Sequence, residues 1–222
     1  MQVLILCGGR GTRLNGERPK PLLEIAGRPI VEHVISIYAR QGFSDFVLLT
    51  GYQGDQVAAW AAGTAWSIEC VDTGVDTPTG GRVHAVRDRL ASRFCLTYAD
   101  GVADIDLAAL FAHHDAAGSL ATMTVVRPEL PFGVAVLDGQ RVSGFREKPI
   151  SSDWVNGGFF VIEPGALDYL AADSVLEREP LERLAADGAL AAYRHTGFWR
   201  CLDTAKDAIA LEDAGPGHWG AI

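Results

Sequence analysis

The sequence predicts an α/β fold with a mixed, mostly parallel sheet, helices on both faces and a smaller antiparallel part. Two observations support this. Short apolar runs alternate with helical patterns over residues 2–117, and short strands joined by tight turns follow from about residue 128. Alternating strands and helices imply right-handed crossovers and a parallel sheet that is covered on both faces. The length of 222 residues and the 48% hydrophobic content fit a single domain that needs no disulfide or metal to hold its core.

The first part of the chain supplies the parallel strands. Residues 2–6 are an apolar run that ends at glycines, as expected of a strand buried on both faces. After Pro29, the residues Ile30, Val34, Ile37 and Tyr38 fall on one face of a helix that ends near Gly42. By the same criteria we expect strands at 45–50, 66–71 and 94–98, and helices at 55–62, from 81 onward and at 106–117.

The second part changes character. We expect strands at 132–137, 142–146 and 155–162, with a turn at Asp138-Gly139, and an antiparallel unit that packs onto the first part. Helical patterns follow at 164–171, 180–187 and 204–213, and the Gly-rich tail 214–222 is expected to fray. We therefore predict one domain with two halves, 1–127 and 128–213, and a tail.

Charge and composition exclude several classes of protein. The net charge of −9 argues against nucleic-acid or acidic-membrane partners, which need a basic field. No apolar run is long enough to span a membrane and the N-terminus has no signal-peptide pattern, so we expect a cytoplasmic protein. The four cysteines form no CxxC motif and are expected to be free thiols.

A glycine-rich loop follows the first strand. Gly8, Gly9 and Gly11 allow backbone N–H groups to approach phosphate oxygens at the carboxyl edge of the sheet. Leu14 stands where a dinucleotide fingerprint needs glycine, and a Walker A ending is absent. Three nearby cations, Arg10, Arg13 and Lys20, favour a polyphosphate ligand in an acidic protein. The alternative is a solvated basic loop.

Two carboxylates are candidate ligands for a metal. Asp100 ends the fourth expected strand and faces the same crevice, where a carboxylate opposite phosphates commonly holds Mg²⁺. Asp203 is the second candidate, with capping of the last helix as its alternative role. Asp104 and Asp106 lie nearby, and for Asp106 we favour an N-cap.

The second half carries two motifs suited to a sugar phosphate. Glu147-Lys148-Pro149 ends one strand and Asn156-Gly157-Gly158 begins the next. Carboxylate and amide groups suit sugar hydroxyls, and Lys148 suits a phosphate, although a Lys-Pro pair also marks an ordinary turn. His195 could line the same pocket.

Taken together, the motifs resemble those of the sugar-1-phosphate nucleotidyltransferases. The order is that of the family over about residues 1–213: a strand, GGRGTRL, PKP, an Asp after the fourth strand, EKP, NGG and a late Asp. The family resemblance implies a Rossmann-like, glycosyltransferase-A-like fold whose smaller antiparallel part binds the sugar. The segments at 71–74, 79–82, 98–104, 156–161 and 195–199 are most similar to members that use CTP and α-D-glucose 1-phosphate.

The resemblance also implies a role for individual residues. Arg13 and Lys20 would be catalytic, and Asp100 and Asp203 would hold Mg²⁺. The nucleotide would be bound by Leu6, Gly8, Gly9, Gly11, Thr12, Arg13, Thr79, Gly80, Gly81, Arg82, Tyr98 and Asp100. The sugar phosphate would be bound by Gly133, Glu147, Lys148, Asn156, Gly157 and Trp199.

The expected reaction is Mg²⁺-dependent transfer of a nucleotidyl group from CTP to a sugar 1-phosphate, giving a CDP-sugar and pyrophosphate. The region between Gly51 and Val71 is shorter than in relatives, which leaves base preference and a possible homo-oligomer open. Alternatives are a guanylyl-, uridylyl- or thymidylyltransferase that acts on another sugar phosphate, such as a heptose or aminosugar phosphate. A non-catalytic nucleotide-sugar binding module is the alternative of a different class.

Overall fold

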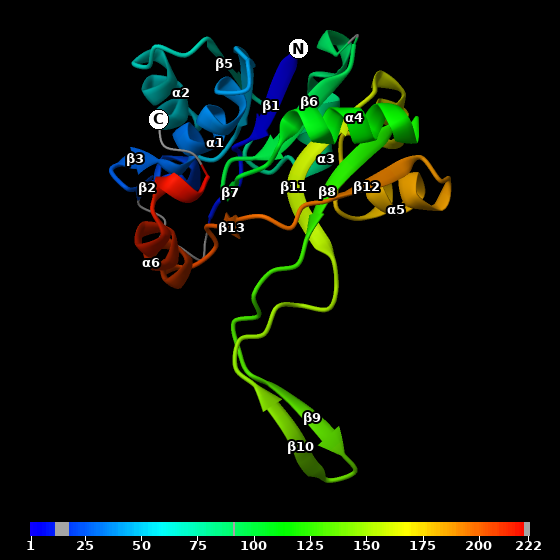
Figure 1. Ribbon diagram of the computed structural model, residues 1–222. Coiled ribbons are helices and arrows are strands. Elements are labelled where there is room, and N and C mark those ends of the chain that lie inside the picture. The colour runs from blue at the N-terminus through cyan, green and yellow to red at the C-terminus, as the bar shows by residue number, and fades with distance from the viewer. Residues whose placement is uncertain (12–17, 91, 220–222) are drawn as a thin grey trace.

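The computed structural model describes residues 1–11, 18–90 and 92–219, and its centre is a seven-stranded sheet in the order β12-β8-β11-β6-β1-β4-β5 (Figure 1). β11 is antiparallel to both of its neighbours, and the other pairs in this sheet are parallel. The mixed, mostly parallel sheet is therefore confirmed. Its strands are β1 (Gln2–Leu6), β4 (Asp45–Thr50), β5 (Ile68–Asp72), β6 (Phe94–Tyr98), β8 (Ala121–Val126), β11 (Val155–Ile162) and β12 (Leu190–Arg194).

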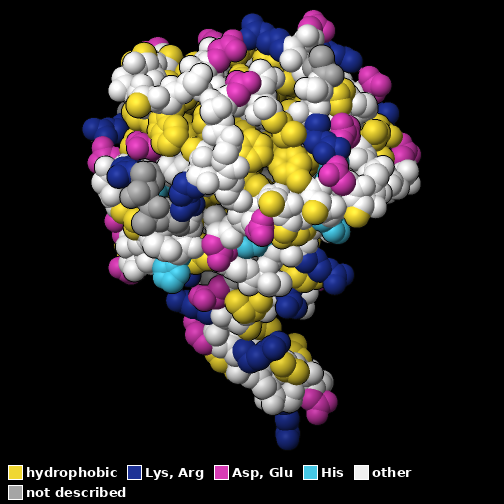
Figure 2. Space-filling model, turned by 45° about the horizontal axis from the view of Figure 1, so that its top comes forward, with side chains coloured by type: hydrophobic (Ala, Val, Ile, Leu, Met, Phe, Trp, Pro, Cys, Tyr) yellow, Lys and Arg dark blue, Asp and Glu magenta, His cyan; other side chains and the backbone are white. Residues whose placement is uncertain are grey.

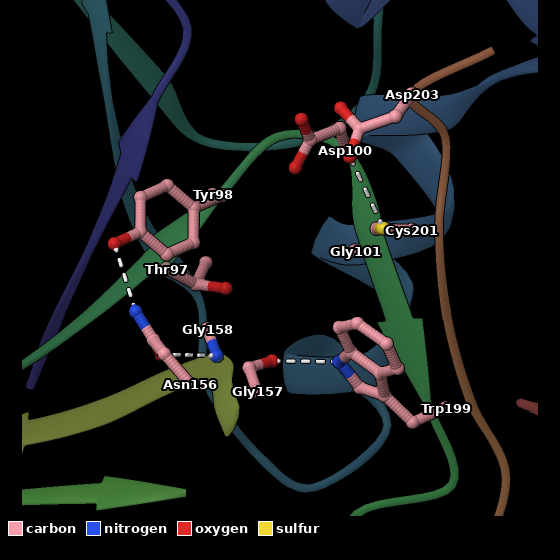
Figure 3. Close-up of a pocket in the computed structure, with 10 residues that line it drawn as sticks. All are labelled: Thr97, Tyr98, Asp100, Gly101, Asn156, Gly157, Gly158, Trp199, Cys201 and Asp203. Carbon is pink, nitrogen blue, oxygen red and sulfur yellow. Dashed lines mark hydrogen bonds between the residues drawn. The ribbon is translucent and has the colours of Figure 1, made fainter. Parts of the chain in front are cut away.

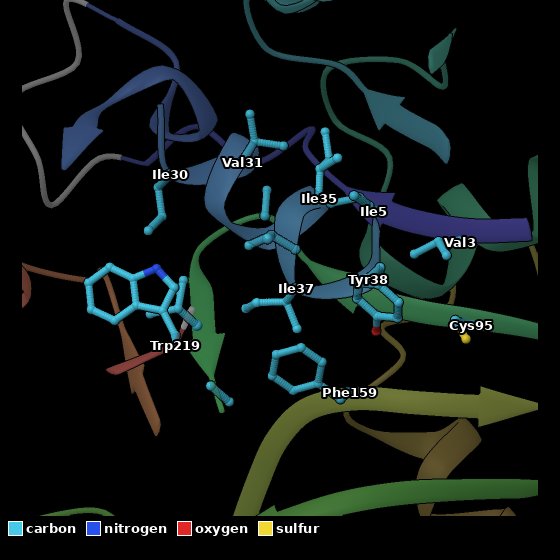
Figure 4. Packing of buried hydrophobic residues seen from close by; sticks show 14 of the residues in the cluster. Val3, Ile5, Ile30, Val31, Ile35, Ile37, Tyr38, Cys95, Phe159 and Trp219 are labelled. Carbon is cyan, nitrogen blue, oxygen red and sulfur yellow. The ribbon is translucent and has the colours of Figure 1, made fainter. Parts of the chain in front are cut away.

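Helices cover both faces of the sheet, also as expected. Successive side chains of a strand point to opposite faces, so Val3 and Ile5 join one buried cluster, whereas Leu4 and Leu6 join the other. The first cluster contains side chains of α1 (Ile30–Ala39), α2 (Gly54–Ala62), α4 (Leu107–Ala117) and α6 (Ala205–Ala214). Figure 4 shows the α1 side chains of this cluster beside Val3 and Ile5 of β1. The second lies under α3 (Thr79–Ala85) and α5 (Glu179–Ala186). Asp106 caps α4, because its carboxylate accepts a hydrogen bond from the Ala109 N–H.

Three short ladders complete the fold. They pair β2 (Glu24–Ile25) with β3 (Arg28–Pro29), β7 (Gly101–Ala103) with β13 (Trp199–Cys201), and β9 (Val134–Asp138) with β10 (Arg141–Arg146). Short 3₁₀ turns occupy Lys20–Leu22, Arg87–Arg89, Pro164–Tyr169 and Pro216–His218. None of the helices in the described part of the chain is long and apolar enough to cross a membrane. All four cysteines are free thiols.

The expected antiparallel unit is arranged differently from the prediction. β11 does not pack onto the first half but lies within the main sheet, between β8 and β6. β9 and β10 form a hairpin arm that extends away from the body (Figure 1). Apolar and charged side chains lie side by side on this arm (Figure 2), where Val136, Leu137, Val142 and Phe145 are exposed. A two-stranded ribbon has no third layer to bury its apolar groups, so exposure follows from its position.

The end of the chain also corrects a prediction. The tail was expected to fray from residue 214, but Trp219 is fully buried. Its indole stacks on Phe198 at 5.5 Å and donates a hydrogen bond from Nε1 to His33 Nδ1 at 3.2 Å. Arg40 donates to the Trp219 carbonyl oxygen. The tail is thus fastened to α1 as far as residue 219.

Candidate active site

The sheet carries two adjoining cavities at the carboxyl ends of β1 and β6. The loop cavity, of about 290 Å³, is lined by the glycine loop after β1, by Lys20 and by the start of α3. The central cavity, of about 240 Å³, is lined by the start of β11 and by β13 (Figure 3). Tyr98 and Asp100 line both cavities, so they form the boundary between them. A larger outer cavity of about 670 Å³ continues from Trp199 and Asp203 and includes His195.

Lys20 lies at the boundary of the two cavities, between two carboxylates. Its ammonium is 2.5 Å from Asp100 Oδ2 and 2.8 Å from Asp203 Oδ1. Burial opposes the charge on Lys20, but the two carboxylates outweigh burial and raise the pKa of the lysine. Lys20 is therefore a permanently charged cation at neutral pH, aimed at the point where the cavities meet.

The β7–β13 ladder explains why the two carboxylates meet. Gly101 pairs with Cys201, and the Leu202 N–H donates to the Asp100 carbonyl oxygen at 2.8 Å. This antiparallel register sets Asp100, one residue before β7, beside Asp203, two residues after β13. Burial raises the pKa of the Cys201 thiol to about 12, and the thiol donates to Asp203 Oδ2 at 3.5 Å. Thr204, not Asp203, caps α6, so the carboxylate of Asp203 is directed to the site.

Arg82 supports the glycine loop from beneath. Arg82 is only 4% exposed, and its guanidinium donates to the carbonyl oxygens of Gly8, Thr50 and Gly74 and to Thr73 Oγ1 at 2.6–3.0 Å. Burial lowers the pKa of Arg82. These acceptors belong to the end of β4 and to the loops that follow β1 and β5. Arg82 lines the loop cavity, and its guanidinium holds in place the backbone segments that form the cavity wall.

The central cavity is shaped by a bend at the start of β11 (Figure 3). Gly158 has a φ of +84°, and a side chain there would meet the Tyr98 ring at 2.8 Å. Trp199 Nε1 donates to the Gly157 carbonyl oxygen at 2.8 Å, and Asn156 Nδ2 donates to the Tyr98 hydroxyl at 3.2 Å. Burial is the main cause that raises the pKa of Tyr98, so its hydroxyl stays protonated.

The structure brings together most of the residues expected at the site. Thr12 and Arg13 lie outside the described residues. Leu6, Gly8, Gly9, Gly11, Lys20, Thr79, Arg82, Tyr98 and Asp100 line the loop cavity, and Tyr98, Asp100, Asn156, Gly157, Trp199 and Asp203 line the central cavity. Gly80 and Gly81 are buried where the segment after Ala171 packs: a side chain at Gly80 would meet the Ser174 carbonyl oxygen at 2.8 Å.

Three expected sugar-phosphate residues lie elsewhere, at the base of the hairpin arm. A side chain at Gly133 would meet Glu147 Oε2 at 2.8 Å, so these two positions are neighbours. Lys148 is exposed and has a φ of +44°, a strained conformation that is often found at functional sites. None of the three lines the cavities described above.

Asp100 and Asp203 fit a Mg²⁺ ion, because both point to one spot where Lys20 already holds a positive charge. Mg²⁺ in phosphate-transfer sites commonly takes one or two carboxylates, with substrate phosphates and water as its other ligands. Among the described residues, no group of three or more His, Cys, Asp or Glu side chains could hold a metal. The two carboxylates would therefore share an ion with the substrate.

Sequence reasoning missed Glu177, whose carboxylate accepts a hydrogen bond from the Tyr98 hydroxyl at 2.6 Å. Glu177 stands in the charged run Leu176-Glu177-Arg178-Glu179, which looks like an ordinary helix start. Nothing local distinguishes it from Glu179. Only the packing of this segment onto α3 directs one of the two carboxylates toward the cavities.

Comparison with known proteins gives a consistent result. The sequence profile of the nucleotidyl transferase family matches residues 2–199. The chain is 38% identical to a probable glucose-1-phosphate cytidylyltransferase of Bacillus subtilis, over 95% of this chain and 94% of that protein. It is 36% identical to the glucose-1-phosphate cytidylyltransferase of Salmonella typhi, over 96% and 95%. HddC from Yersinia pseudotuberculosis, complexed with GMP-PN, shares the fold with a TM-score of 0.76 and 19% identity, over 96% of this chain and 98% of that chain.

Proposed function

The chain belongs to the nucleotidyl transferase family, and on that premise we propose that it transfers a cytidylyl group from CTP to α-D-glucose 1-phosphate. Sugar-1-phosphate nucleotidyltransferase activity is supported by relatives that are named for such an activity and align over nearly the whole chain. The choice of CTP and glucose 1-phosphate follows the two relatives at 38% and 36% identity.

One observation supports the proposal above the others: the Lys20 ammonium lies between Asp100 and Asp203 where the two cavities meet. A transferase of this kind must bring two anions together, a triphosphate and a sugar phosphate. Two adjoining cavities with a half-buried cation at their boundary provide the space for both anions and the charge that offsets their repulsion.

The mechanism we infer needs no strong general base. The attacking oxygen of a sugar 1-phosphate is already an anion. It would attack the α-phosphorus in line, forming the new P–O bond while the bond to pyrophosphate breaks. Lys20 would stabilise the charge that develops on the α-phosphoryl oxygens, and the backbone N–H groups of the glycine loop would orient the triphosphate. Arg82 would act on the same loop by holding its backbone in place.

Asp100 and Asp203 would hold Mg²⁺, which supplies charge neutralisation on the phosphate oxygens when it is bound. Lys20 bridges the same carboxylates. Its flexible stem would let the ammonium move from these carboxylates to the α-phosphate while its charge is kept.

We further propose that the chain divides by function at about residue 128. Residues 1–127 would bind the nucleotide, and residues 128–213 would bind the sugar phosphate, with Glu147 on sugar hydroxyls and Lys148 on the phosphate. Asn156 and Gly157 at the central cavity would complete this second subsite.

The test is pyrophosphate release with Mg²⁺ and glucose 1-phosphate, comparing CTP, UTP, GTP, ATP and dTTP. A clear preference for CTP is expected. Preference for another triphosphate would overturn the cytidylyltransferase assignment and would leave a guanylyl-, uridylyl- or thymidylyltransferase. Turnover only with a heptose or aminosugar phosphate would overturn the sugar assignment. Tight triphosphate binding without turnover on any sugar phosphate would indicate a binding module.

A further inference from the structure

A single carboxylate connects the walls of the two cavities. The Tyr98 hydroxyl donates to Glu177 Oε1 at 2.6 Å, and the Thr79 hydroxyl donates to Glu177 Oε2 at 2.6 Å. Thr79 begins α3 and lines the loop cavity, whereas Tyr98 lines both cavities. Each oxygen of Glu177 therefore holds a hydroxyl group from a different wall.

The connection continues to the bend in β11. Asn156 Nδ2 donates to the Tyr98 hydroxyl at 3.2 Å, and Asn156 Oδ1 accepts from the Gly158 N–H at 2.8 Å (Figure 3). A chain of hydrogen bonds thus runs from Thr79 through Glu177, Tyr98 and Asn156 to the backbone of Gly158. Its two ends lie in different cavities.

The backbone around Glu177 is fixed from outside the site. The Gly81 N–H donates to the Ser174 carbonyl oxygen at 3.0 Å, and the Leu176 N–H donates to Thr79 Oγ1 at 2.9 Å. Such close approach needs Gly80 and Gly81, which leave room for the segment before Glu177. Because Leu176 and Thr79 are joined directly, Glu177 keeps its place relative to α3.

Tyr98 depends on this carboxylate. Burial, and then the charge of Glu177, raises the pKa of Tyr98, so the phenol remains a donor. Tyr98 is half-buried and its hydrogen bond to Glu177 is exposed, so loss of the carboxylate would remove a charge-assisted hydrogen bond that holds the ring and would free the ring to rotate. Rotation would alter the boundary of both cavities at once.

We propose that Glu177 is a positioning residue that fixes Tyr98 between the loop cavity, which would hold the triphosphate, and the central cavity, which would hold the sugar phosphate. Glu177 thereby couples the binding of the two substrates. This inference rests on the proposed function. Loss of the Glu177 carboxylate should weaken the binding of both substrates, whereas loss of a side chain that lines only one cavity should weaken the binding of one substrate.

The first experiment compares Glu177→Ala, Glu177→Gln and the control Glu179→Ala. Glu179 lies two residues away, is also exposed, and pairs with Arg183 at 2.9 Å without lining either cavity. We expect Glu177→Ala to raise KM for both substrates by about tenfold, the scale of one lost charge-assisted hydrogen bond. Glu177→Gln should recover part of this, because its amide oxygen accepts one of the two hydroxyls. Glu179→Ala should leave both KM values and Tm unchanged.

The second experiment is a double-mutant cycle with Tyr98→Phe. If Glu177 acts through Tyr98, Glu177→Ala should add little to the KM values of the Tyr98→Phe protein. Fully additive effects would overturn the inference, as would a rise in KM for only one substrate or a fall in Tm with unchanged KM. If the wild-type protein releases no pyrophosphate, the proposed function fails. The same cycle is then measured on the Kd of CTP by calorimetry, where additive effects or absent binding would overturn the inference as well.

Discussion

The loop cavity and the base of the hairpin arm differ in how they are built. At the loop cavity, Arg82 is buried and bonded to the backbone at the end of β4 and in the loops after β1 and β5. At the base of the hairpin arm, Glu147 and Lys148 are exposed, and the β9–β10 ribbon next to them extends from the body. The wall of the loop cavity is therefore part of the buried structure that stabilises the fold. The base of the hairpin arm carries exposed side chains that can change at little cost to stability.

The largest expected effect tests the buried side. Arg82→Met would remove the buried guanidinium that donates to the carbonyl oxygens of Gly8, Thr50 and Gly74, and should lower the free energy of unfolding by about 4 kcal/mol. Urea denaturation would measure this. The control is Arg89→Met, which removes only an exposed pair with Glu69 and should cost less than about 1 kcal/mol. An equal loss of unfolding free energy in Arg82→Met and Arg89→Met would show that the buried arginine does not hold the loop cavity together.

The next effect is on turnover. Lys20→Ala should lower kcat about a hundredfold, because the charge at the boundary of the two cavities is lost. Steady-state pyrophosphate release would measure it, with Arg18→Ala as the control, since Arg18 is exposed and pairs with Glu24. A Lys20→Ala protein with undiminished kcat would contradict the role assigned to this lysine.

A smaller effect should distinguish the exposed side. Lys148→Ala is expected to raise KM for the sugar phosphate by about tenfold while leaving KM for CTP and the free energy of unfolding unchanged. Arg141→Ala, on the same arm, is the matched control. If Lys148→Ala destabilised the fold as Arg82→Met does, the contrast between the two sides would be wrong.

The smallest effect concerns the anchor of the C-terminal segment. His33 accepts from Trp219 and its Nε2 lies 2.7 Å from the Ile25 carbonyl oxygen, which fits the neutral ring, and burial lowers its pKa below 6.5. Below about pH 6.5 the unfolded chain binds a proton that folded His33 resists, so the free energy of unfolding should fall as the pH falls from that value. Urea denaturation at pH 7.5 and 5.5 should show a weaker pH dependence in His33→Gln than in the wild type. His113→Gln, at an exposed histidine, should retain the wild-type dependence.

The periodicity of the sequence predicted most of the sheet and both helical layers, because burial on both faces leaves a local pattern in strands such as β1. Two strands of the seven-stranded sheet, β8 and β12, were not predicted. β12 reads Leu-Ala-Ala-Tyr-Arg, which favours a helix locally, and pairing with β8 overrides that preference. β8 reads Ala-Thr-Met-Thr-Val-Val, a strand-like run that the same criteria could have found.

The candidate site was predictable where a motif and a strand end coincide, as at Gly8, Asp100 and Asn156. The contacts were not. The approach of Asp203 to Lys20 depends on the β7–β13 ladder, and the role of Arg82 depends on three loops meeting at one guanidinium. Strand register and loop packing bring together residues that are far apart in the chain, so these contacts cannot be predicted from the local spacing of residues in the sequence.

The position of the Arg82 guanidinium limits how the protein can be redesigned. A side chain at Gly8 or at Gly51 would overlap this group, so the three positions can change only as a set. Thr77 lines the same cavity, and its hydroxyl donates to the Thr73 carbonyl oxygen rather than bonding to Arg82. A library that aims to alter base preference should keep Gly8, Gly51 and Arg82 constant and vary the rim, where new side chains need not displace a buried cation.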